Sequence, residues 1–465
     1  MLRGPRQEHI VTLAGASMIA PTKQDKKARI SNRLLIFCLI LIAFGAGFFK
    51  VFHRRQPALF QIRPIAKSSN DEPRFRSHFV STRKYVHTHA ASLIELKDGR
   101  IRAFWFSGSL EGSPDVEIHS AVFDPDRDQW GPEHKVANGE STRRSVLRRI
   151  KRIGNPVPGR AADGTLWLFY VTVSVGGWSG SSITAMTSSD EGETWSPARR
   201  LISSPFLNNS TLVKGTPFLY ADGTLGLPVY HQFIGRFGEL LHLDSNGAVI
   251  DKQRLSAGDY SLQPIVLIRS AREALALLRY SGAEHPYRVI STMTNDAGQH
   301  WTPPVKSSLS NPGAALSGVV LPDGRILVAL NNLEKGRDLL SLVISGDGGT
   351  TWRTVYPLED QLATRLNGSP DQCLDEAQYL RTIEGLARAT DPTVTEAGAY
   401  SESTKRQMCE AQRCSFEFSY PYLIQTQRGD FHLVYTWNRS FIKHVRFNQS
   451  WLERRLGKPA DGQLH

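Results

Sequence analysis

A short turn between two apolar, strand-forming runs recurs along this chain. Clear copies fall at Asp98-Gly99, Asp163-Gly164, Asp222-Gly223, Asp323-Gly324 and Arg428-Gly429. A weaker turn at residues 270–272 divides the long interval after the third copy. A two-residue turn of this kind between apolar runs is a strong signal for a β-hairpin. The sequence therefore predicts six hairpins, about 50 to 65 residues apart except for a longer interval before the last.

A second motif, S-x-D-x-G-x-T-W, follows three of these turns. Residues 188–195 and 345–352 match it, and residues 294–301 match it loosely. Two turns per unit divide each unit into four short strands, and six such units predict an all-β, six-bladed β-propeller. We expect the aspartates of these Asp boxes to be structural, because Asp and Ser side chains satisfy turn amides and Gly supplies the positive φ.

The last interval is longer because it holds an insertion, which we place near 359–415. Its spacing is helical between Asp371 and Arg388, so the insertion is expected to contain helix. Cys373, Cys409 and Cys414 all fall within it and allow one disulfide, whose pairing the sequence leaves open. No Cys/His spacing resembles a zinc site, and no nucleotide motif appears, so we expect neither metal nor cofactor.

The rest of the chain divides by composition. We expect a basic tail at 1–33, an apolar segment at 34–52, a tether at 53–77, the propeller at 78–450 and a C-terminal tail at 451–465. Residues 34–49 carry no charge, which is short but sufficient for a bilayer span if the following lysine extends to the interface. We predict an uncleaved single-pass transmembrane anchor, with a signal peptide as the alternative. In both cases the propeller is expected on the extracytoplasmic side (periplasmic, extracellular or lumenal).

The positive charge does not indicate a nucleic-acid partner. The net charge is +12, but residues 1–67 hold 12 Lys and Arg against 2 Asp and Glu, while the remaining residues hold 44 against 42. The propeller is thus nearly neutral, which argues against phosphate binding.

Strand direction places one set of side chains at the rim opposite the hairpin turns. Eight residues of strand span about 26 Å, the height of a blade, so positions about eight residues from each turn share that rim. Before the turns these positions are His89, Asn155, Lys214, Gln263, Asn311 and Tyr420. After the turns they include Tyr230, His231, Arg279 and Arg439, and the loops that leave the rim carry Glu111, Asp115 and Arg337. Such polar, aromatic and basic groups on one rim indicate a carbohydrate site.

Asp boxes on a six-bladed pattern resemble the sialidase (neuraminidase) superfamily and its bacterial-neuraminidase-repeat relatives, over roughly residues 80–450. The resemblance implies an exo-glycoside hydrolase acting on a carboxylated sugar, outside the usual two-carboxylate scheme of glycosidases. Arg279, in ALALLRYSG, resembles the second arginine of the family's carboxylate clamp, and Arg337, before an Asp box, resembles the third. Tyr420, in FSYPYLI, resembles the nucleophile, and Glu111 or Asp115 would be the acid/base.

Two positions depart from the family pattern. His89 stands where the first clamp arginine would be, and Gln263 stands where a glutamate would polarise the tyrosine. Glu417 is a possible substitute for that glutamate. The remaining rim residues, Asn155, Lys214, Tyr230, His231, Asn311 and Arg439, are then candidates for substrate binding.

The departures leave two other functions open. One is a lyase for acidic polysaccharides, in which His89, His231 or Tyr420 would remove a proton beside the sugar carboxylate. The other is a non-catalytic propeller that binds glycans. The expected partner is in each case an acidic glycan, with the membrane as a second partner through the N-terminal helix.

Overall fold

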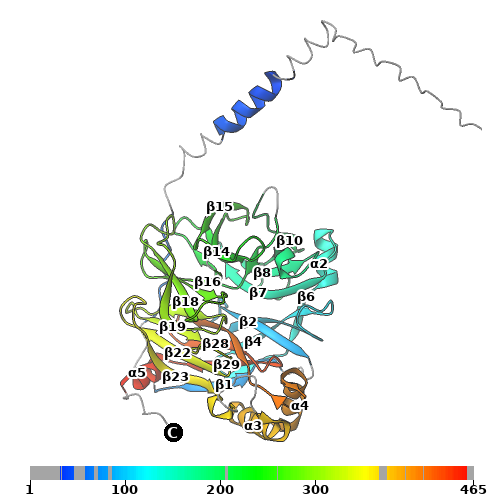
Figure 1. The fold of residues 1–465 in the computed structure, drawn as a ribbon, viewed down its shortest axis with the longest axis vertical. Helices are drawn as coiled ribbons and strands as arrows, with labels where there is room; N and C mark the ends of the chain where they lie inside the picture. Colours follow the sequence, from blue (N-terminus) through cyan, green and yellow to red (C-terminus); the bar gives the residue numbers. More distant parts are fainter. Residues whose placement is uncertain are drawn as a thin grey trace, which may run out of the picture. The chain divides into compact units, whose positions relative to one another are not determined.

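The computed structural model describes residues 32, 34–46, 58–66, 72–81, 86–204, 208–258, 260–365, 374–392, 394–411 and 413–457. The chain divides into two units between Pro57 and Ala58, and each is described by itself. The larger unit consists mainly of antiparallel sheets of consecutive strands (Figure 1).

The first three sheets follow one another along the chain. The first contains β2 (His87–Glu95), β3 (Ile101–Gly108), β4 (Glu117–Asp124), β5 (Gln129–Trp130) and β6 (His134–Asn138). Helix α2 (Gly139–Val146) then leads to the second sheet. That sheet contains β7 (Arg152–Arg160), β8 (Leu166–Val173), β9 (Ser181–Ser188), which follows the 3-10 turn η1 (Trp178–Gly180), and β10 (Arg199–Arg200). The third contains β11 (Leu212–Val213), β12 (Phe218–Leu219), β13 (Leu225–His231), β14 (Phe237–Leu243) and β15 (Val249–Arg254).

The next three sheets complete the set. The fourth contains β16 (Ser261–Ile268), β17 (Ala274–Tyr280), β18 (Arg288–Thr294) and β19 (Val305–Ser310). The fifth contains β20 (Ser317–Val320), β21 (Ile326–Leu330), β22 (Leu339–Ser345) and β23 (Arg353–Asp360). The sixth contains β27 (Phe418–Gln425), β28 (Phe431–Trp437), β29 (Phe441–Phe447) and β1 (Phe75–Phe79).

The six sheets of the described residues form a closed ring. β2 contacts both β7 and β27, β7 contacts β11, β16 contacts β13 and β20, and β20 contacts β27. Each sheet thus turns its first strands toward the axis, which is the arrangement of a six-bladed β-propeller. The propeller part of the sequence prediction is confirmed. In this order the third and the sixth sheets stand on opposite sides of the axis.

The ring is closed by the N-terminal strand. β1 pairs with β29, with Phe75 opposite Phe447 and Phe79 opposite Lys443, and becomes the outer strand of the sixth sheet. Helix α5 (Gln449–Gly457) supports this junction, because the ring of Trp451 lies 4.8 Å from that of Phe75. Strand β1 therefore includes residues 75–77 of the stretch expected to be a tether.

Residues 58–66 of that stretch also contact the propeller. Phe60 is only 2% exposed, its N–H donates to the carbonyl of Ala271, and its ring stacks 5.5 Å from that of Tyr220. Burying an aromatic ring contributes roughly 2 kcal/mol to stability. The compact unit begins at Ala58, ahead of the expected boundary at residue 78.

The Asp boxes have the structural role expected of them. Asp190 accepts hydrogen bonds from the backbone N–H and the hydroxyl of Thr194, and Ser188 accepts one from the N–H of Gly192. Gly192 has φ of 91°, a conformation that glycine adopts without strain. The box at Asp347 repeats these bonds, and the box at Asp296 repeats the backbone ones with Thr294 in place of the serine.

The insertion contains helix, as expected. After the 3-10 turn η2 (Leu362–Thr364) come helices α3 (Glu376–Thr390) and α4 (Ala397–Met408). A small sheet pairs β24 (Leu374–Asp375), just before α3, with β26 (Arg413–Cys414), which also pairs with β25 (Cys409–Glu410) after α4. Tyr379 and Ile383 of α3 are buried in the same apolar cluster as Phe418 of β27. A disulfide joins Cys409 to Cys414, and Cys373 lies outside the described residues.

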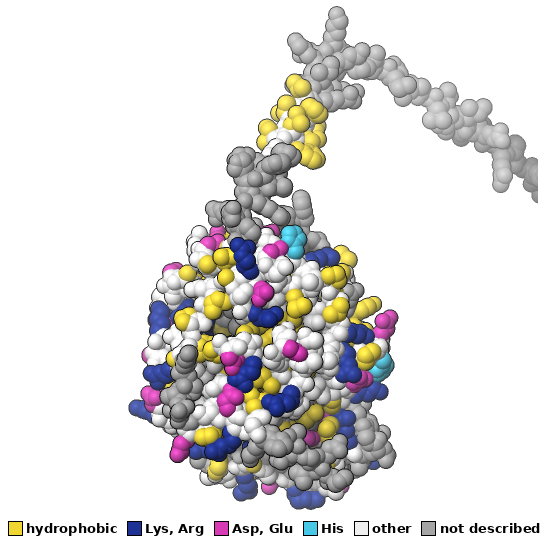
Figure 2. Space-filling view, turned by 90° about the vertical axis from the view of Figure 1, so that its left-hand side faces the viewer, with side chains coloured by type: hydrophobic (Ala, Val, Ile, Leu, Met, Phe, Trp, Pro, Cys, Tyr) yellow, Lys and Arg dark blue, Asp and Glu magenta, His cyan; other side chains and the backbone are white. Residues whose placement is uncertain are grey.

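The transmembrane helix expected at 34–52 is a wrong prediction. Residues 34–46 are helical, and most of their side chains are apolar (Figure 2). A helix of this length rises about 20 Å, against a hydrocarbon core of about 30 Å. Among the described residues, no helix is long and apolar enough to cross a membrane. Residues 47–52 and the basic tail at 1–31 lie outside the described residues.

Candidate active site

Four of the inner strands bulge at the same level, near the rim that carries the sequence-predicted residues. The pairing register shifts after His89 in β2, and equivalent shifts occur in β7, β16 and β27. At each bulge one residue has φ between 46° and 54°, namely Ala90, Asn155, Gln263 and Tyr420. Bulges re-aim side chains and are frequent beside active sites, and a non-glycine residue in this region is strained. Three of these four strained residues are predicted site residues.

Gln263 links Tyr420 to Arg279. The Arg279 guanidinium donates to Oε1 of Gln263 at 3.2 Å, and Nε2 of Gln263 donates to the hydroxyl oxygen of Tyr420 at 3.2 Å. An arginine only donates, so its contact fixes the orientation of the amide. The Tyr420 hydroxyl therefore accepts from Gln263 rather than giving it a proton. Nε of Arg279 is buried without a hydrogen-bond partner among the described residues.

Glu417 is held between two arginines. Its carboxylate accepts from Arg337 at 3.1 Å, from Nε of Arg439 at 2.7 Å and from the hydroxyl of Ser419 at 2.8 Å. The N–H of Phe418 also donates to the carbonyl of Arg337, which fixes the two chain segments together. Burial opposes ionisation of Glu417, but Arg337 and Arg439 outweigh it and lower its pKa to about 2. Glu417 is thus a carboxylate that orients the arginines.

A tight turn between β28 and β29 positions Arg439. Asn438 and Arg439 have φ of 48° and 52°, and the N–H of Ser440 donates to the carbonyl of Trp437, as in a type I′ hairpin turn. The carbonyl of Arg439 accepts from the N–H of Thr88, next to His89. Arg439 therefore lies beside the start of β2, and its charge acts on His89.

Of the two predicted acids, only Glu111 interacts with this group. Glu111 is exposed in its loop, but the protein around its carboxyl partly desolvates it and raises its pKa, against the opposing charges of Arg439, Arg337 and Arg279. Asp115 instead accepts hydrogen bonds from the N–H and the hydroxyl of Ser109, at 2.8 and 2.9 Å. These bonds join the two ends of the loop that contains Asp115.

His89 packs against the nucleophile candidate. Its ring lies 4.3 Å from that of Tyr420 and 5.6 Å from that of His87. Burial, reinforced by the charge of His87, lowers the pKa of His89 well below its usual value, so it is neutral at pH 7. Gln407 of α4 contacts Nδ1 of His87 at 3.3 Å, which connects the insertion to the site.

Tyr230 and Lys214 form the buried part of the site. The Tyr230 hydroxyl lies 3.5 Å from Nε2 of Gln263, and burial raises the pKa of Tyr230. Lys214 is 4% exposed, and its ammonium faces the rings of Tyr420 and Tyr422. These two side chains lie against the candidate nucleophile, and their polar atoms are largely screened from solvent.

The remaining predicted residues have local roles or lie at the edge of the site. Asn155 is a bulge residue of β7. Asn311 is fully buried, and its Oδ1 accepts from the N–H of Ala314. Nε2 of His231 accepts from the N–H of Ile234 in the same loop, and its ring stacks on Phe237. The contacts of Asn311 and His231 are thus local to their own loops.

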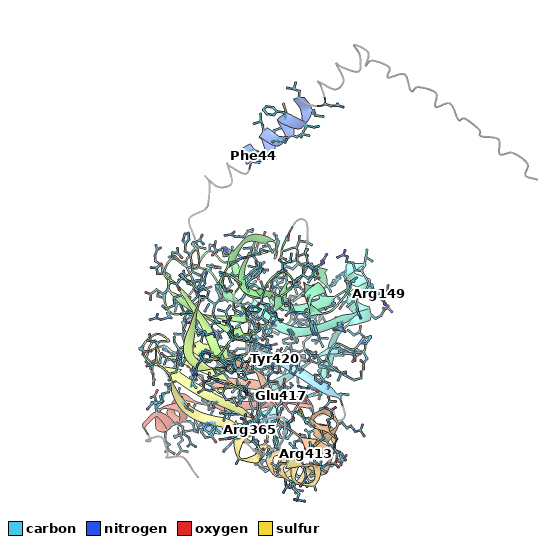
Figure 3. The ribbon with its side chains drawn as sticks, viewed as in Figure 1. Phe44, Arg149, Arg365, Arg413, Glu417 and Tyr420 are labelled. Carbon is cyan, nitrogen blue, oxygen red and sulfur yellow. A yellow bond between two sulfur atoms is a disulfide. The ribbon has the colours of Figure 1, made fainter. Side chains whose placement is uncertain are left out.

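Sequence reasoning missed the groups that support the arginines. Asp338 is 1% exposed, forms an ion pair with Arg365 of the insertion, and adjoins Arg337 in the chain. Ser419 and His87 likewise touch Glu417 and His89. No local pattern marks Arg365, since its partner is fixed only by the fold. Figure 3 shows Glu417 and Tyr420 near the middle of the view, with Arg149, which follows α2 in the chain, at the outer edge.

Six blades, three of them with Asp boxes, that carry arginines and a strained tyrosine on one rim define a sialidase-like β-propeller. The sequence matches the BNR repeat-like domain family over residues 99–433, which is well over half of the chain. The chain therefore belongs to the BNR repeat-like domain family. No curated protein sequence matches it.

Solved structures share this fold at low sequence identity. A Hadza microbial sialidase is 15% identical, with a TM-score of 0.55 over 77% of this chain and 65% of its own. A Dyadobacter fermentans protein of unknown function is 14% identical, with a TM-score of 0.56 over 80% of this chain and 98% of its own. An intramolecular trans-sialidase from Ruminococcus gnavus is 13% identical, with a TM-score of 0.53 over 80% and 96%. This chain spans less than two thirds of the Hadza sialidase, and these likenesses show the fold alone.

Proposed function

We propose that this propeller is a glycoside hydrolase that removes a terminal carboxylated sugar, sialic-acid-like or uronic, from a glycan. The observation that supports it most is the convergence of Arg279, Arg337 and Arg439 on the rim that holds Tyr420. Among the described residues, the charges that act on Glu111 are those of these three guanidinium groups and of one carboxylate, Glu417. The excess positive charge favours an anionic ligand, and planar guanidinium groups suit a carboxylate.

The roles of the reacting groups follow from their surroundings. Tyr420 would attack the anomeric carbon through its phenol oxygen. Glu111 would protonate the leaving oxygen, a task that its raised pKa favours. Asp115 fits this role less well, because Ser109 already donates to both of its carboxylate oxygens. Glu417 would orient Arg337 and Arg439 without touching the sugar.

A non-catalytic glycan-binding propeller is the second candidate. The orientation of Gln263 favours it, because an amide N–H points at the Tyr420 hydroxyl where a proton acceptor would be needed. A binding protein requires the arginines but no activated nucleophile. For both candidates we propose an extracytoplasmic location, which the Cys409–Cys414 disulfide supports.

A substrate screen with three variants tests the proposal. The native chain is incubated with fluorogenic sialosides and uronides, and both the released fluorophore and the ultraviolet absorbance of unsaturated uronates are measured. Tyr420→Phe is expected to lower kcat by at least a hundredfold, as loss of a nucleophile does. Arg279→Ala is expected to raise KM about tenfold or more, since truncating one side of a charge pair costs about 2 kcal/mol or more.

Tyr356→Phe, on the outer strand β23, is the matched control and should leave turnover unchanged. Binding of acidic glycans without turnover would establish the second candidate instead. Equal binding of neutral and acidic sugars would refute the carboxylate argument for both candidates.

A further inference from the structure

Lys214 reaches across the propeller axis. It follows β11 in the third sheet, and its Nζ lies 4.9 Å from the ring centre of Tyr422 and 5.8 Å from that of Tyr420, both in the sixth sheet. The third and sixth sheets stand on opposite sides of the ring. Nζ also donates to the carbonyl of Pro421 at 3.4 Å. The ammonium is therefore held against the strand that carries the candidate nucleophile.

The charge of Lys214 is poorly compensated. Its side chain is buried, and its contacts in the described residues are two aromatic faces and one carbonyl. Burial alone lowers the pKa of Lys214 to about 7. A buried ammonium without a carboxylate is costly. Ionisation of a neighbouring hydroxyl would give it the counter-charge that it lacks.

We propose that Lys214 activates Tyr420 by stabilising its phenolate form, in place of the carboxylate that Gln263 cannot supply. The role of this phenolate in catalysis rests on the proposed function. Its formation does not, because it depends only on Lys214 and Gln263. The Gln263 amide assists, because its N–H already donates to the phenol oxygen and would hold a negative charge there. Lys214 is thus a positioning and electrostatic group that does not touch the sugar.

The proposed step is balanced without any further reactant. Tyr420 releases its proton to water, and the phenolate electron pair forms the bond to the anomeric carbon. The glycosidic C–O bond breaks, and its electron pair takes a proton from Glu111. A water molecule later displaces the Tyr420 oxygen and gives its proton back to Glu111.

Other charged groups around Tyr420 do not provide the same activation. His89 faces its ring and is held neutral by burial, and Tyr230 is a buried neutral phenol. Arg279 reaches Tyr420 only through Gln263, and Glu111 carries the opposite sign. The Lys214 ammonium faces the Tyr420 ring at 5.8 Å from its centre, so its positive charge favours a negative charge on that side chain.

The test measures the reactivity of Tyr420 without any sugar. The native chain and Lys214→Met are treated with a phenolate-selective electrophile such as N-acetylimidazole, and labelling of each tyrosine is followed by peptide mass spectrometry from pH 5.5 to 9. We expect Lys214→Met to slow the labelling of Tyr420 at pH 6.5 by ten- to a hundredfold. Labelling of Tyr260, which is 55% exposed, serves as the internal standard.

The pH profile distinguishes an electrostatic role from a structural one. In the native chain the labelling rate of Tyr420 should rise with pH only until Lys214 loses its proton, near pH 7, and then level off. In Lys214→Met it should rise tenfold per pH unit throughout. Lys214→Arg retains the positive charge and should label Tyr420 as fast as the native chain at neutral pH. This variant tests the role of the charge even if Lys214→Met folds poorly.

Lys306→Met is the matched control, because it removes an ammonium 4.6 Å from another ring, that of Tyr280. It should leave Tyr420 unchanged. Equal labelling of Tyr420 in native protein and folded Lys214→Met, within twofold, would overturn the proposal. Lys214-dependent labelling without turnover of any sugar would refute the proposed hydrolase function and leave the activation of Tyr420 standing.

Discussion

Replacing Glu417 by Gln tests whether this buried carboxylate holds the arginines of the site. Gln has nearly the volume of Glu and mimics its protonated form, so the variant removes the charge and little else. The pKa of Glu417 is about 2 in the folded chain against an ordinary value of 4.5. A difference of about 2.5 pKa units corresponds to about 3 kcal/mol of stability at neutral pH. That value lies within the usual cost of breaking a buried ion pair.

The assay is thermal unfolding by calorimetry. For a unit of about 400 residues the unfolding entropy is about 0.8 kcal/mol/K, so 3 kcal/mol lowers Tm by about 4 °C. Because the folded-state pKa is lowered, the contribution of Glu417 is complete above pH 4.5 and is lost as the pH falls toward 2. The Tm difference between native chain and Glu417→Gln should therefore be constant near neutrality and shrink below pH 4.5.

Glu453→Gln is the control for this experiment. Glu453 also pairs with an arginine, Arg325, but at the surface, with 46% of its side chain exposed. Exposed pairs contribute about 0 to 1 kcal/mol, so Tm should change by about 1 °C at most. A Tm loss for Glu417→Gln that does not exceed the control, or that does not vary with pH, would refute the assigned role of Glu417.

Three further predictions concern other parts of the structure. Gln263→Glu supplies the missing proton acceptor and should raise kcat on a fluorogenic sialoside at least tenfold; an unchanged kcat would contradict this reading. Asp338→Asn removes the buried partner of Arg365 and should cost about 3 kcal/mol in urea unfolding, with weaker binding of acidic sugars by calorimetry. His432 contacts His444 at 3.0 Å, and burial lowers the pKa of His432 to about 3. Stability should therefore fall as the pH drops from 6.5 toward 3, with His432 contributing up to about 1.4 kcal/mol per pH unit, and a shallower fall in His432→Gln would identify this contribution.

The blades could be predicted from the sequence because each is a local unit. A hairpin turn such as Asp163-Gly164 and the Asp box at 188–195 both act over a few residues, so their spacing alone defines four strands. Strand β1 could not be found in this way. Its sequence FRSHF has little apolar alternation, and its partner β29 lies at the other end of the propeller sequence.

The sequence predicts which residues belong to the site better than it predicts the contacts between them. The distance from each turn placed Gln263 and Tyr420 on one rim, and their hydrogen bond agrees with that placement. The bulges were not predictable, because Gln263 and Tyr420 adopt positive φ without being glycine. The pairing of Glu417 with Arg337 depends on two blades meeting side by side, which no local pattern encodes.

The pairing of β1 with β29 also sets a constraint on biosynthesis. The outer strand of the last blade is made first and must wait for its neighbour until residues 441–447 have left the ribosome. During that time the nascent chain carries an open strand edge that other proteins could capture. A circular permutant in which residues 72–81 directly follow the sixth blade would remove this wait, and its folding yield would show how much the delay limits production of the native ring.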